Sequence, residues 1–262
     1  MKSFIMDIDY KKENIDYWTD RAPSYSEQNR EELDTDRHER WQNYIHGVIK
    51  EKFPEKNAGK IKILDIGTGP GFFAIILSQL GYDVTAIDYT DEMLSEAREN
   101  SKKYGVNPEF IEMDADALSF EAESFDVVIS RNVTWNLPKP ERAFSEWLRV
   151  LADKGILLIF DANWYGYLFD EDKRKEYEED RQLTEELDIY DEYIHTDISR
   201  MEAIAYEAPL SRCTRPAWDK EYFENTGCSS IEIDERVWET VWTREEKINY
   251  RATPMFRVLV QK

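Results

Sequence analysis

The stretch from Lys60 to Phe73, KIKILDIGTGPGFF, constrains the fold of this chain more than any other. It opens with an apolar, partly β-branched run, the pattern of a strand buried in a parallel sheet. The run stops at a glycine-rich turn, Gly67 to Gly71, and apolar residues with helical spacing follow at once. A strand, a glycine turn and a helix in this order present backbone N–H groups and a helix N-terminus to a nucleotide-like ligand. We therefore expect an α/β protein with a binding site at this turn.

Two details of the turn restrict the chemical class of the ligand that it can bind. Its glycines follow the spacing G-x-G-x-G, not the dinucleotide fingerprint G-x-G-x-x-G, and Asp65 stands just before the first of them. A carboxylate disfavours a diphosphate but attracts an ammonium group. The stretch resembles motif I of the class I S-adenosylmethionine (SAM) dependent methyltransferases, an acidic residue followed by x-G-x-G-x-G. The resemblance implies that SAM, which has an amino group, a sulfonium and no phosphate, contacts Asp65, Gly67, Thr68, Gly69 and Gly71. The alternative is a structural turn in another α/β protein.

A second acidic residue ends the next expected strand, Asp83 to Asp88. Asp88 follows Asp65 by about 20 residues, the spacing at which such folds place a carboxylate on ribose hydroxyls. In the family that this region resembles, the residues after this acid often pack on the adenine, which makes Tyr89 and Met93 candidates. A core position explains a methionine equally well.

A third strand, Glu109 to Met113, leads into the sequence DADAL. This resembles the D-A-x-x-L motif of the same family. The resemblance implies that the Asp114 carboxylate and the backbone N–H of Ala115 address the adenine edge, while Asp116 is a solvated loop acid.

The fourth expected strand, Phe125 to Ser130, should end facing the transferable methyl group. The next residues, RNVTWNLP, are polar and aromatic, as expected of a loop that lines a reaction centre. Asn132 and Asn136 are candidates to orient an acceptor, and Trp135 is a candidate wall of its pocket, together with Trp164 and Tyr165. Asn136-Leu137-Pro138 lacks the second proline and the aromatic residue of the N-P-P-Y motif of amino-methylating enzymes, so that chemistry is not inferred.

Charged and titratable side chains leave the acceptor open. Arg131 is a candidate cofactor contact, and either Arg131 or Arg215 is alternatively a partner for a substrate carboxylate. A dedicated base is needed only if the nucleophile must first lose a proton. The sequence offers no clear base: of the three histidines, His38, His46 and His195, we take His195 as the candidate, against a structural role for all three.

The N-terminal segment contains YWTDRAPSY, from Tyr17 to Tyr25. It is similar to a segment that in many small-molecule methyltransferases folds over SAM, where its last tyrosine, here Tyr25, reaches the cofactor. The alternative is that these aromatic residues anchor the segment to the fold. Apolar spacing predicts an amphipathic helix from Asn29 to Phe53. We expect residues 1–59 to form a helical lid and residues 60–262 the SAM-binding core.

The rest of the chain completes the expected sheet. Pro140 to Leu151 predicts a helix and Gly155 to Phe160 a fifth strand, in a pattern that also looks like this family. Residues 164–217 are expected to form an inserted helical cap. Between residues 170 and 197 the sequence contains thirteen acidic and four basic residues, and its apolar and aromatic residues show partial helical spacing. Alternation over residues 229–242 and 254–260 predicts an antiparallel hairpin. The resemblance implies a doubly wound, mostly parallel, seven-stranded Rossmann-like sheet of order 3-2-1-4-5-7-6.

Composition excludes some classes of partner. The 262 residues carry a net charge of −21, which disfavours nucleic acid as a partner. We attribute this charge to solubility, and the alternative is that it steers a cationic substrate toward the protein. Two cysteines and three histidines leave little material for a metal site. Cys213 and Cys228 are ordinary thiols in this interpretation, against binding of a soft metalloid. With no signal peptide or membrane span in sight, we expect a cytoplasmic protein.

The sequence thus predicts a SAM-dependent methyltransferase acting on a small molecule through nitrogen, oxygen or another nucleophile, with S-adenosylhomocysteine (SAH) as product. It is expected to work as a monomer or homodimer. An aminopropyl transfer would require acids in the loop after the fourth strand, which has none. A nicotinamide-type dehydrogenase would require G-x-G-x-x-G. A SAM-binding sensor without activity would not require a polar loop at that place.

Overall fold

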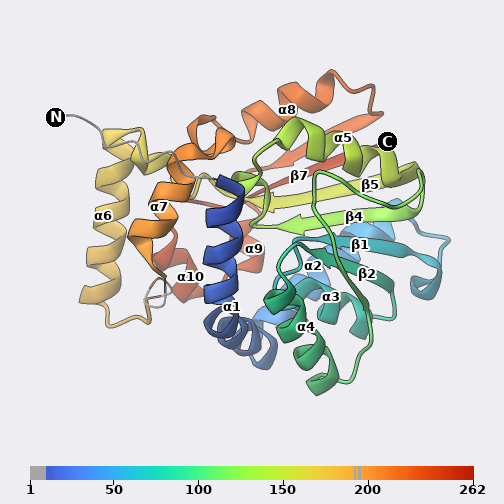
Figure 1. Cartoon of the computed structure of the whole chain (residues 1–262), viewed down its shortest axis with the longest axis horizontal. Coiled ribbons are helices and arrows are strands. Elements are labelled where there is room, and N and C mark those ends of the chain that lie inside the picture. The colour runs from blue at the N-terminus through green and yellow to red at the C-terminus, as the bar shows by residue number, and fades with distance from the viewer. Residues whose placement is uncertain (1–9, 192, 194–195) are drawn as a thin grey trace.

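The computed structural model describes residues 10–191, 193 and 196–262, and its centre is a seven-stranded sheet (Figure 1). The strand order is β3-β2-β1-β4-β5-β7-β6, as predicted. Strands β3, β2, β1, β4 and β5 run parallel to one another, while β7 pairs antiparallel with both β5 and β6. The strands are β1 (Lys62–Ile66), β2 (Asp83–Asp88), β3 (Glu109–Glu112), β4 (Phe125–Arg131), β5 (Leu151–Asp161), β6 (Ser230–Asp234) and β7 (Phe256–Gln261).

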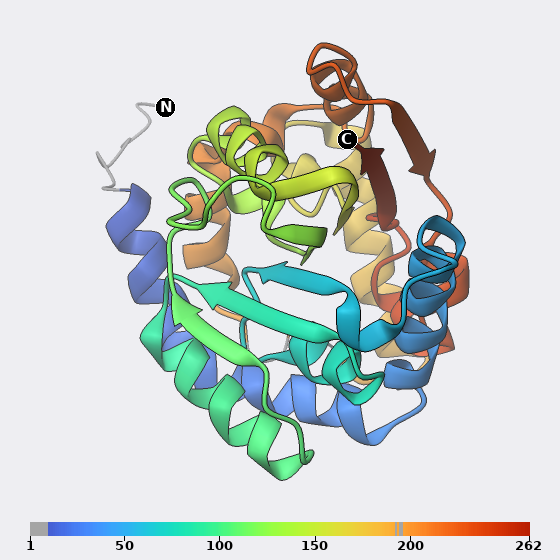
Figure 2. The same cartoon turned by 90° about the vertical axis from the view of Figure 1, so that its right-hand side faces the viewer.

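Helices cover both faces of the sheet, as expected for parallel strands that are buried on both sides (Figure 2). One face packs against α2 (Arg37–Lys52), α3 (Phe72–Gln79) and α9 (Trp238–Val241), with α4 (Asp91–Lys103) beside α3 and β2. The other face packs against α5 (Pro140–Val150) and α8 (Ala217–Glu224). The apolar run Ile63, Leu64 and Ile66 supplies both cores, because alternate residues point to opposite faces.

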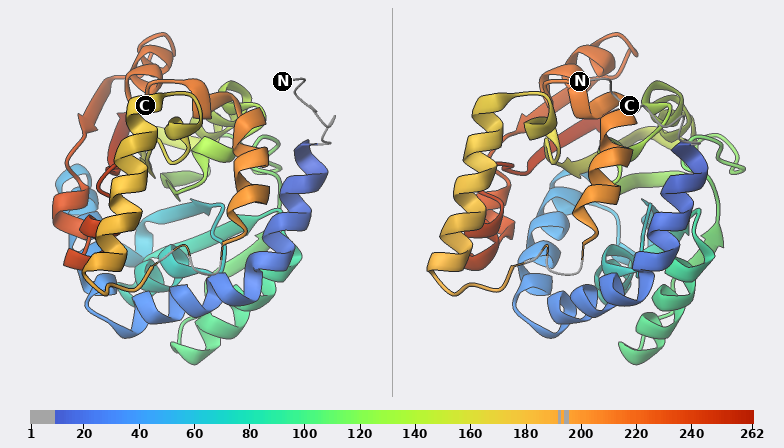
Figure 3. Two further views of the ribbon diagram at one scale, coloured as in Figure 1. Left: turned by 90° about the vertical axis from the view of Figure 1, so that its left-hand side faces the viewer. Right: turned by 60° about the vertical axis from the view of Figure 1, so that its left-hand side comes forward.

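Three long helices lie across the carboxyl ends of the parallel strands. Figure 3 shows α1 (Tyr10–Asp34) beside α7 (Ile198–Glu207) at that end, with α6 (Glu171–Glu186) farther from α1, on the other side of α7. Helix α1 contacts α4 and α7, and α6 packs against α10 (Arg244–Asn249). An aromatic cluster around Tyr17, Trp135 and Tyr165 fills the space between α1, α7 and the loop after β4. Within the described residues, no helix combines the length and the apolar character needed to cross a membrane.

The N-terminal helices differ from the predicted ones. The helix expected from Asn29 to Phe53 is two helices, because α1 ends at Asp34 and α2 begins at Arg37. The Thr35 hydroxyl donates to the carbonyl of Glu31 at 2.9 Å, so a side chain takes up an acceptor at the end of α1. Upstream, α1 continues through Pro23 to Tyr10, over a segment where the apolar residues alone show no clear helical period.

The hairpin prediction was partly wrong. Strand β6 ends at Asp234, although the alternating pattern continues to Trp242. The Asp234 carboxylate accepts a hydrogen bond from the backbone N–H of Arg236 at 2.9 Å, which turns the chain into α9. Strand β7 forms where the second half of the hairpin was expected.

Candidate active site

The glycine turn joins β1 to α3 at the carboxyl edge of the sheet. Gly67 has φ +65°, and a Cβ there would lie 2.5 Å from Cγ2 of Val133 in the loop after β4. Gly69 has φ +53°, and a Cβ there would lie 3.5 Å from the ring of Tyr25. Only glycine meets both the left-handed conformation and the close approach at Gly67. The turn therefore brings α1 and the loop after β4 to the same point.

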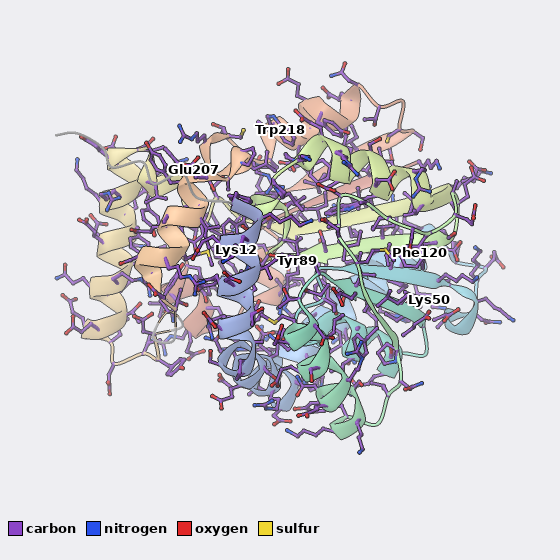
Figure 4. The ribbon with its side chains drawn as sticks, viewed as in Figure 1. Lys12, Lys50, Tyr89, Phe120, Glu207 and Trp218 are labelled. Atoms are coloured by element: carbon purple, nitrogen blue, oxygen red, sulfur yellow. The ribbon has the colours of Figure 1, made fainter. Side chains whose placement is uncertain are left out.

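A pocket opens at this point, between the turn, α1 and the loops after β2, β3 and β4. Figure 4 shows Tyr89, one of its lining residues, beside α1. The lining includes eleven of the sequence-predicted site residues: Tyr25, Gly67, Gly69, Asp88, Tyr89, Met93, Asp114, Ala115, Arg131, Asn132 and Asn136. Residues as far apart in the chain as Tyr25 and Asn136 thus share one cavity, because the parallel strands end at one edge.

Asp88 lies at the end of β2 and holds the turn in place. Its carboxylate accepts hydrogen bonds from the backbone N–H of Gly69 and of Thr90, each at 3.0 Å. The side chain is nearly buried, and burial raises its pKa above the ordinary value for an aspartate. Asp88 therefore connects the glycine turn to Thr90, the residue that precedes α4.

Asp65 lies below the turn and is also buried. It accepts a hydrogen bond from the Thr68 hydroxyl at 2.6 Å. Burial raises the pKa of Asp65 to about 7, although the Thr68 hydrogen bond and the charge of Arg131 act in the opposite direction. The pocket lining does not include three of the predicted cofactor contacts, Asp65, Thr68 and Gly71.

Another part of the pocket lining consists of Tyr89, Met93, Asp114 and Ala115. The Asp114 carboxylate pairs with the Lys11 ammonium at 2.6 Å and accepts the backbone N–H of Asp116 at 3.2 Å. Burial would raise the pKa of Asp114, but these partners lower it overall, so the group is a carboxylate at neutral pH. This part of the pocket carries a negative charge that α1 partly neutralises.

Comparison with known proteins identifies the framework of this site. Residues 64–159 match a family described as "Methyltransferase domain". The chain is 33% identical to a phosphatidylethanolamine N-methyltransferase of Cereibacter sphaeroides over 131 residues, which cover 47% of this chain and 64% of the relative. Residues 64–159 are a methyltransferase domain of the class I SAM-dependent type. The resemblance predicted from the sequence is thereby confirmed.

Two further comparisons extend this result. A demethylmenaquinone methyltransferase of Thermus thermophilus is 33% identical over 124 residues, 47% of this chain and 54% of the relative. In both relatives the chain spans less than two thirds of the relative's length. The solved structure of the plantazolicin methyltransferase BpumL in complex with SAH superposes with a TM-score of 0.58 over 97% of both chains, at 15% identity. That likeness shows that the methyltransferase fold extends through nearly the whole chain.

Helix α1 supplies site residues of the methyltransferase domain that sequence reasoning missed. Tyr10, Asn14 and Trp18 line the pocket from one face of α1, followed by the predicted Tyr25. Their spacing of four residues, continued by Tyr25 on the same face, is the helical signal that could have found them. The other missed lining residues are Lys11, Met113, Val133, Leu137 and Pro138.

Asn136 is tied to α1. Its amide forms a reciprocal pair with the Asn14 amide, with N–O distances of 2.9 and 2.8 Å. The Tyr10 hydroxyl also donates to the Asn136 side-chain oxygen at 2.9 Å. In this state the Asn136 amide holds α1 against the loop after β4, and Asn136 also lines the pocket together with Asn132.

Other predicted site residues lie elsewhere. The Trp135 ring packs on Tyr165 at 4.8 Å in the aromatic cluster, and its indole N–H donates to the Asn132 carbonyl, outside the pocket lining. Trp164 donates its indole N–H to Asp161 at 2.8 Å. His195 lies outside the described residues. His38 and His46 are on α2 and bond to the Thr35 carbonyl and the Tyr82 hydroxyl.

Both candidate arginines are paired within the protein. The Arg131 guanidinium bonds to Glu32 at 2.8 Å, and Arg215 bonds to Asp161 and Asp219. Among the described residues, neither guanidinium is left to bind a substrate carboxylate without exchanging a partner. Arg131 still contributes to the pocket lining.

Asn14→Ala is expected to loosen α1 from the site. The variant leaves the Asn136 amide without its reciprocal partner, and each lost hydrogen bond contributes about 1 kcal/mol. We expect the free energy of unfolding to fall by about 1–3 kcal/mol and amide hydrogen exchange over residues 10–20 to accelerate. Urea denaturation and exchange mass spectrometry measure these effects. Lys12→Ala, on the exposed side of the same helix, is the control, and equal exchange rates in both variants would contradict the prediction.

Proposed function

We propose that this pocket binds SAM and that the enzyme transfers the SAM methyl group to a small-molecule acceptor, with SAH as product. The observation that carries the proposal is the pair of buried carboxylates, Asp65 and Asp88, around the glycine turn. Their hydrogen bonds come from a threonine hydroxyl and from backbone N–H groups. Two such carboxylates suit a ligand with an ammonium group and ribose hydroxyls, and they would repel a diphosphate.

Unpaired polar atoms in the lining support a polar ligand. In the described part of the chain, the Tyr89 hydroxyl and the Asn132 side-chain oxygen are buried without a hydrogen-bond partner. A buried polar group without a partner costs about 1–3 kcal/mol. A ligand that donates to Asn132 and bonds to Tyr89 would recover that free energy, so the residues present fit a nucleoside with polar substituents.

Each part of the pocket has a proposed role. Asp88 accepts hydrogen bonds from the ribose hydroxyls while it keeps the Gly69 N–H in place. Asp65 attracts the ammonium group through the turn, and Tyr25 covers the turn from α1. Asp114 and the N–H of Ala115 address the adenine edge, while Tyr89 and Met93 pack on its ring. These assignments are the motif roles that the family resemblance implies.

Bound SAM supplies a methyl group that is already activated and a neutral leaving group. The protein therefore contributes mainly alignment, with the nucleophile held about 3 Å from the methyl carbon. Asn132 is positioned for this because its backbone N–H bonds to the Phe160 carbonyl at 2.9 Å and its side-chain oxygen is unpaired. That oxygen can accept a hydrogen bond from an acceptor amine or hydroxyl. The names of the relatives, which cover a phospholipid amine and a quinone, support small-molecule acceptors.

Calorimetric titration with SAM, SAH and NAD⁺ tests the proposal. We expect dissociation constants in the micromolar range for SAM and SAH, about −8 kcal/mol, and no binding of NAD⁺. A protein that binds neither SAM nor SAH would refute it. Incubation with SAM and a fractionated metabolite extract, followed by SAH quantification, then tests transfer. SAM binding without SAH formation above the no-extract control in any fraction would favour a sensor.

A further inference from the structure

The strand register places three charged side chains on one face of the sheet. In the parallel pairing, Asp65 on β1 lies opposite Ala86 on β2 and Ile129 on β4. Because side chains alternate along a strand, Asp88 and Arg131 point to the same face as Asp65, each two residues further along. This is the face that packs against α2 and α3. Two carboxylates and one guanidinium are therefore buried together at the carboxyl edge.

Arg131 is held at this place by aromatic rings and by one carboxylate. Its guanidinium carbon lies 4.3 Å from the centre of the Phe72 ring and 5.2 Å from that of Phe73. The Glu32 carboxylate of α1 accepts its hydrogen bond at 2.8 Å, and the two side chains are 12% and 16% exposed. The position of the guanidinium is thus set on one side by the first turn of α3 and on the other by α1.

Two charged groups, one on each neighbouring strand, act on Asp65. Asp88 on β2 opposes its ionisation, while Arg131 on β4 favours it. Behind Arg131 lie Tyr25 and Glu32 of α1, and Glu246 of α10, which pairs at 3.9 Å with Arg37 of α2. A negative charge beside Arg131 offsets part of the stabilisation that Arg131 gives to the ionised Asp65 carboxylate, because both charges act on the same low-dielectric site.

We propose that Arg131 and Glu32 together set the charge of Asp65, and through it the pH range in which the site accepts the ammonium group of SAM. Arg131 is then a positioning residue that acts through Asp65. This inference rests on the proposed function, since it assigns a regulator to the same SAM site. Helix α1 then has two functions, because it lines the pocket and its Glu32 influences the charge of Asp65.

The proposal gives the wild-type protein a defined pH dependence. The pKa of Asp65 is raised to about 7 in the free protein, and an ammonium ligand favours the ionised form. As Asp65 gains its proton, SAM affinity should therefore fall toward about tenfold for each pH unit below that value. Between pH 8 and pH 6 the expected loss is about tenfold.

Two variants should shift this profile in opposite directions. Arg131→Gln removes the favourable charge, and the midpoint should rise by roughly one pH unit. Glu32→Gln frees Arg131 from its carboxylate, and the midpoint should fall. Arg131→Lys keeps the charge and should restore most of the wild-type profile. Glu31→Gln makes the same charge change at an exposed neighbouring position of α1 and should leave the midpoint unchanged.

The experiment is SAM calorimetry between pH 5.5 and 8.5 on these proteins, with ¹³C NMR titration of the Asp65 carboxyl carbon in the ligand-free state. Asp65→Asn assigns the resonance and should remove the loss of affinity centred near pH 7. The NMR titration tests the charge relation even if SAM does not bind, an outcome that would refute the proposed function alone. Midpoints that stay equal, or that move the same way in Arg131→Gln and Glu32→Gln, would overturn the inference. If Arg131→Gln does not fold, Glu32→Gln against Glu31→Gln decides it.

Discussion

Replacement of Asp88 by alanine is expected to weaken SAM binding about 100-fold, which corresponds to about 2.7 kcal/mol. The substitution removes the acceptor proposed for the ribose hydroxyls. It also leaves the backbone N–H groups of Gly69 and Thr90 without the carboxylate that now accepts them at 3.0 Å. The glycine turn would then lose its side-chain connection to β2, while the backbone bond from the Thr68 N–H to the Ile87 carbonyl at 2.9 Å would remain. Both the contact with the ligand and the shape of the turn around Gly69 would therefore change.

Calorimetry with SAM and SAH on the wild type, Asp88→Ala and Asp88→Asn measures this effect. Asparagine keeps one side-chain oxygen and should give an intermediate loss, because charged acceptors bond more strongly than neutral ones. Asp91→Ala removes an exposed carboxylate in the first turn of α4 and serves as control. If Asp88→Ala bound SAM as well as Asp91→Ala does, the assignment of this pocket to SAM would be wrong.

Replacement of Arg215 by methionine is expected to lower the free energy of unfolding by about 3–5 kcal/mol. Arg215 bonds to Asp219 through two nitrogens, at 2.8 and 2.6 Å, and to Asp161 at 3.0 Å. Both carboxylates are fully buried. Without the guanidinium, two buried negative charges would remain, and each would have to be protonated or exposed to water.

The effect should reach the active site because Asp161 also holds the loop after β4. The Thr134 hydroxyl and the Trp135 backbone N–H both donate to the same Asp161 oxygen that accepts Arg215. Urea denaturation measures the stability, and SAM calorimetry on the folded fraction reports on the loop. The double variant with Asp219→Asn has one buried charge fewer and should recover part of the loss. A change below about 1 kcal/mol in Arg215→Met would contradict this account.

Sequence reasoning succeeded where a pattern is local. The glycine turn with Asp65, the strand that ends in Asp88 and the motif at Asp114 each occupy a few consecutive residues. Their strands were predicted correctly, and the family resemblance supplied the sheet order. These parts were readable because buried parallel strands and tight βα turns impose residue types directly on the chain.

Sequence reasoning was less successful where partners are distant along the chain. The sequence offers Arg131 and Arg215 as free cations, but their partners are Glu32 in α1 and Asp161 in β5, and the chain gives no sign of either pairing. Asn136 looks like a catalytic amide, yet it bonds to Asn14, more than 100 positions away. The extent of α1 was also missed, because its pocket-facing residues are polar and aromatic and do not give an apolar stripe.

The sequence by itself determined that this chain forms a methyltransferase-type α/β sheet with an acidic, glycine-rich site at its carboxyl edge. Only the tertiary structure decided which charges at that edge are paired and which atoms face the pocket. The physical reason is that backbone propensity and strand burial depend on neighbours in the chain. The ionisation of Asp65 and the commitment of Asn136 depend on side chains that folding brings together from α1, β4 and β5.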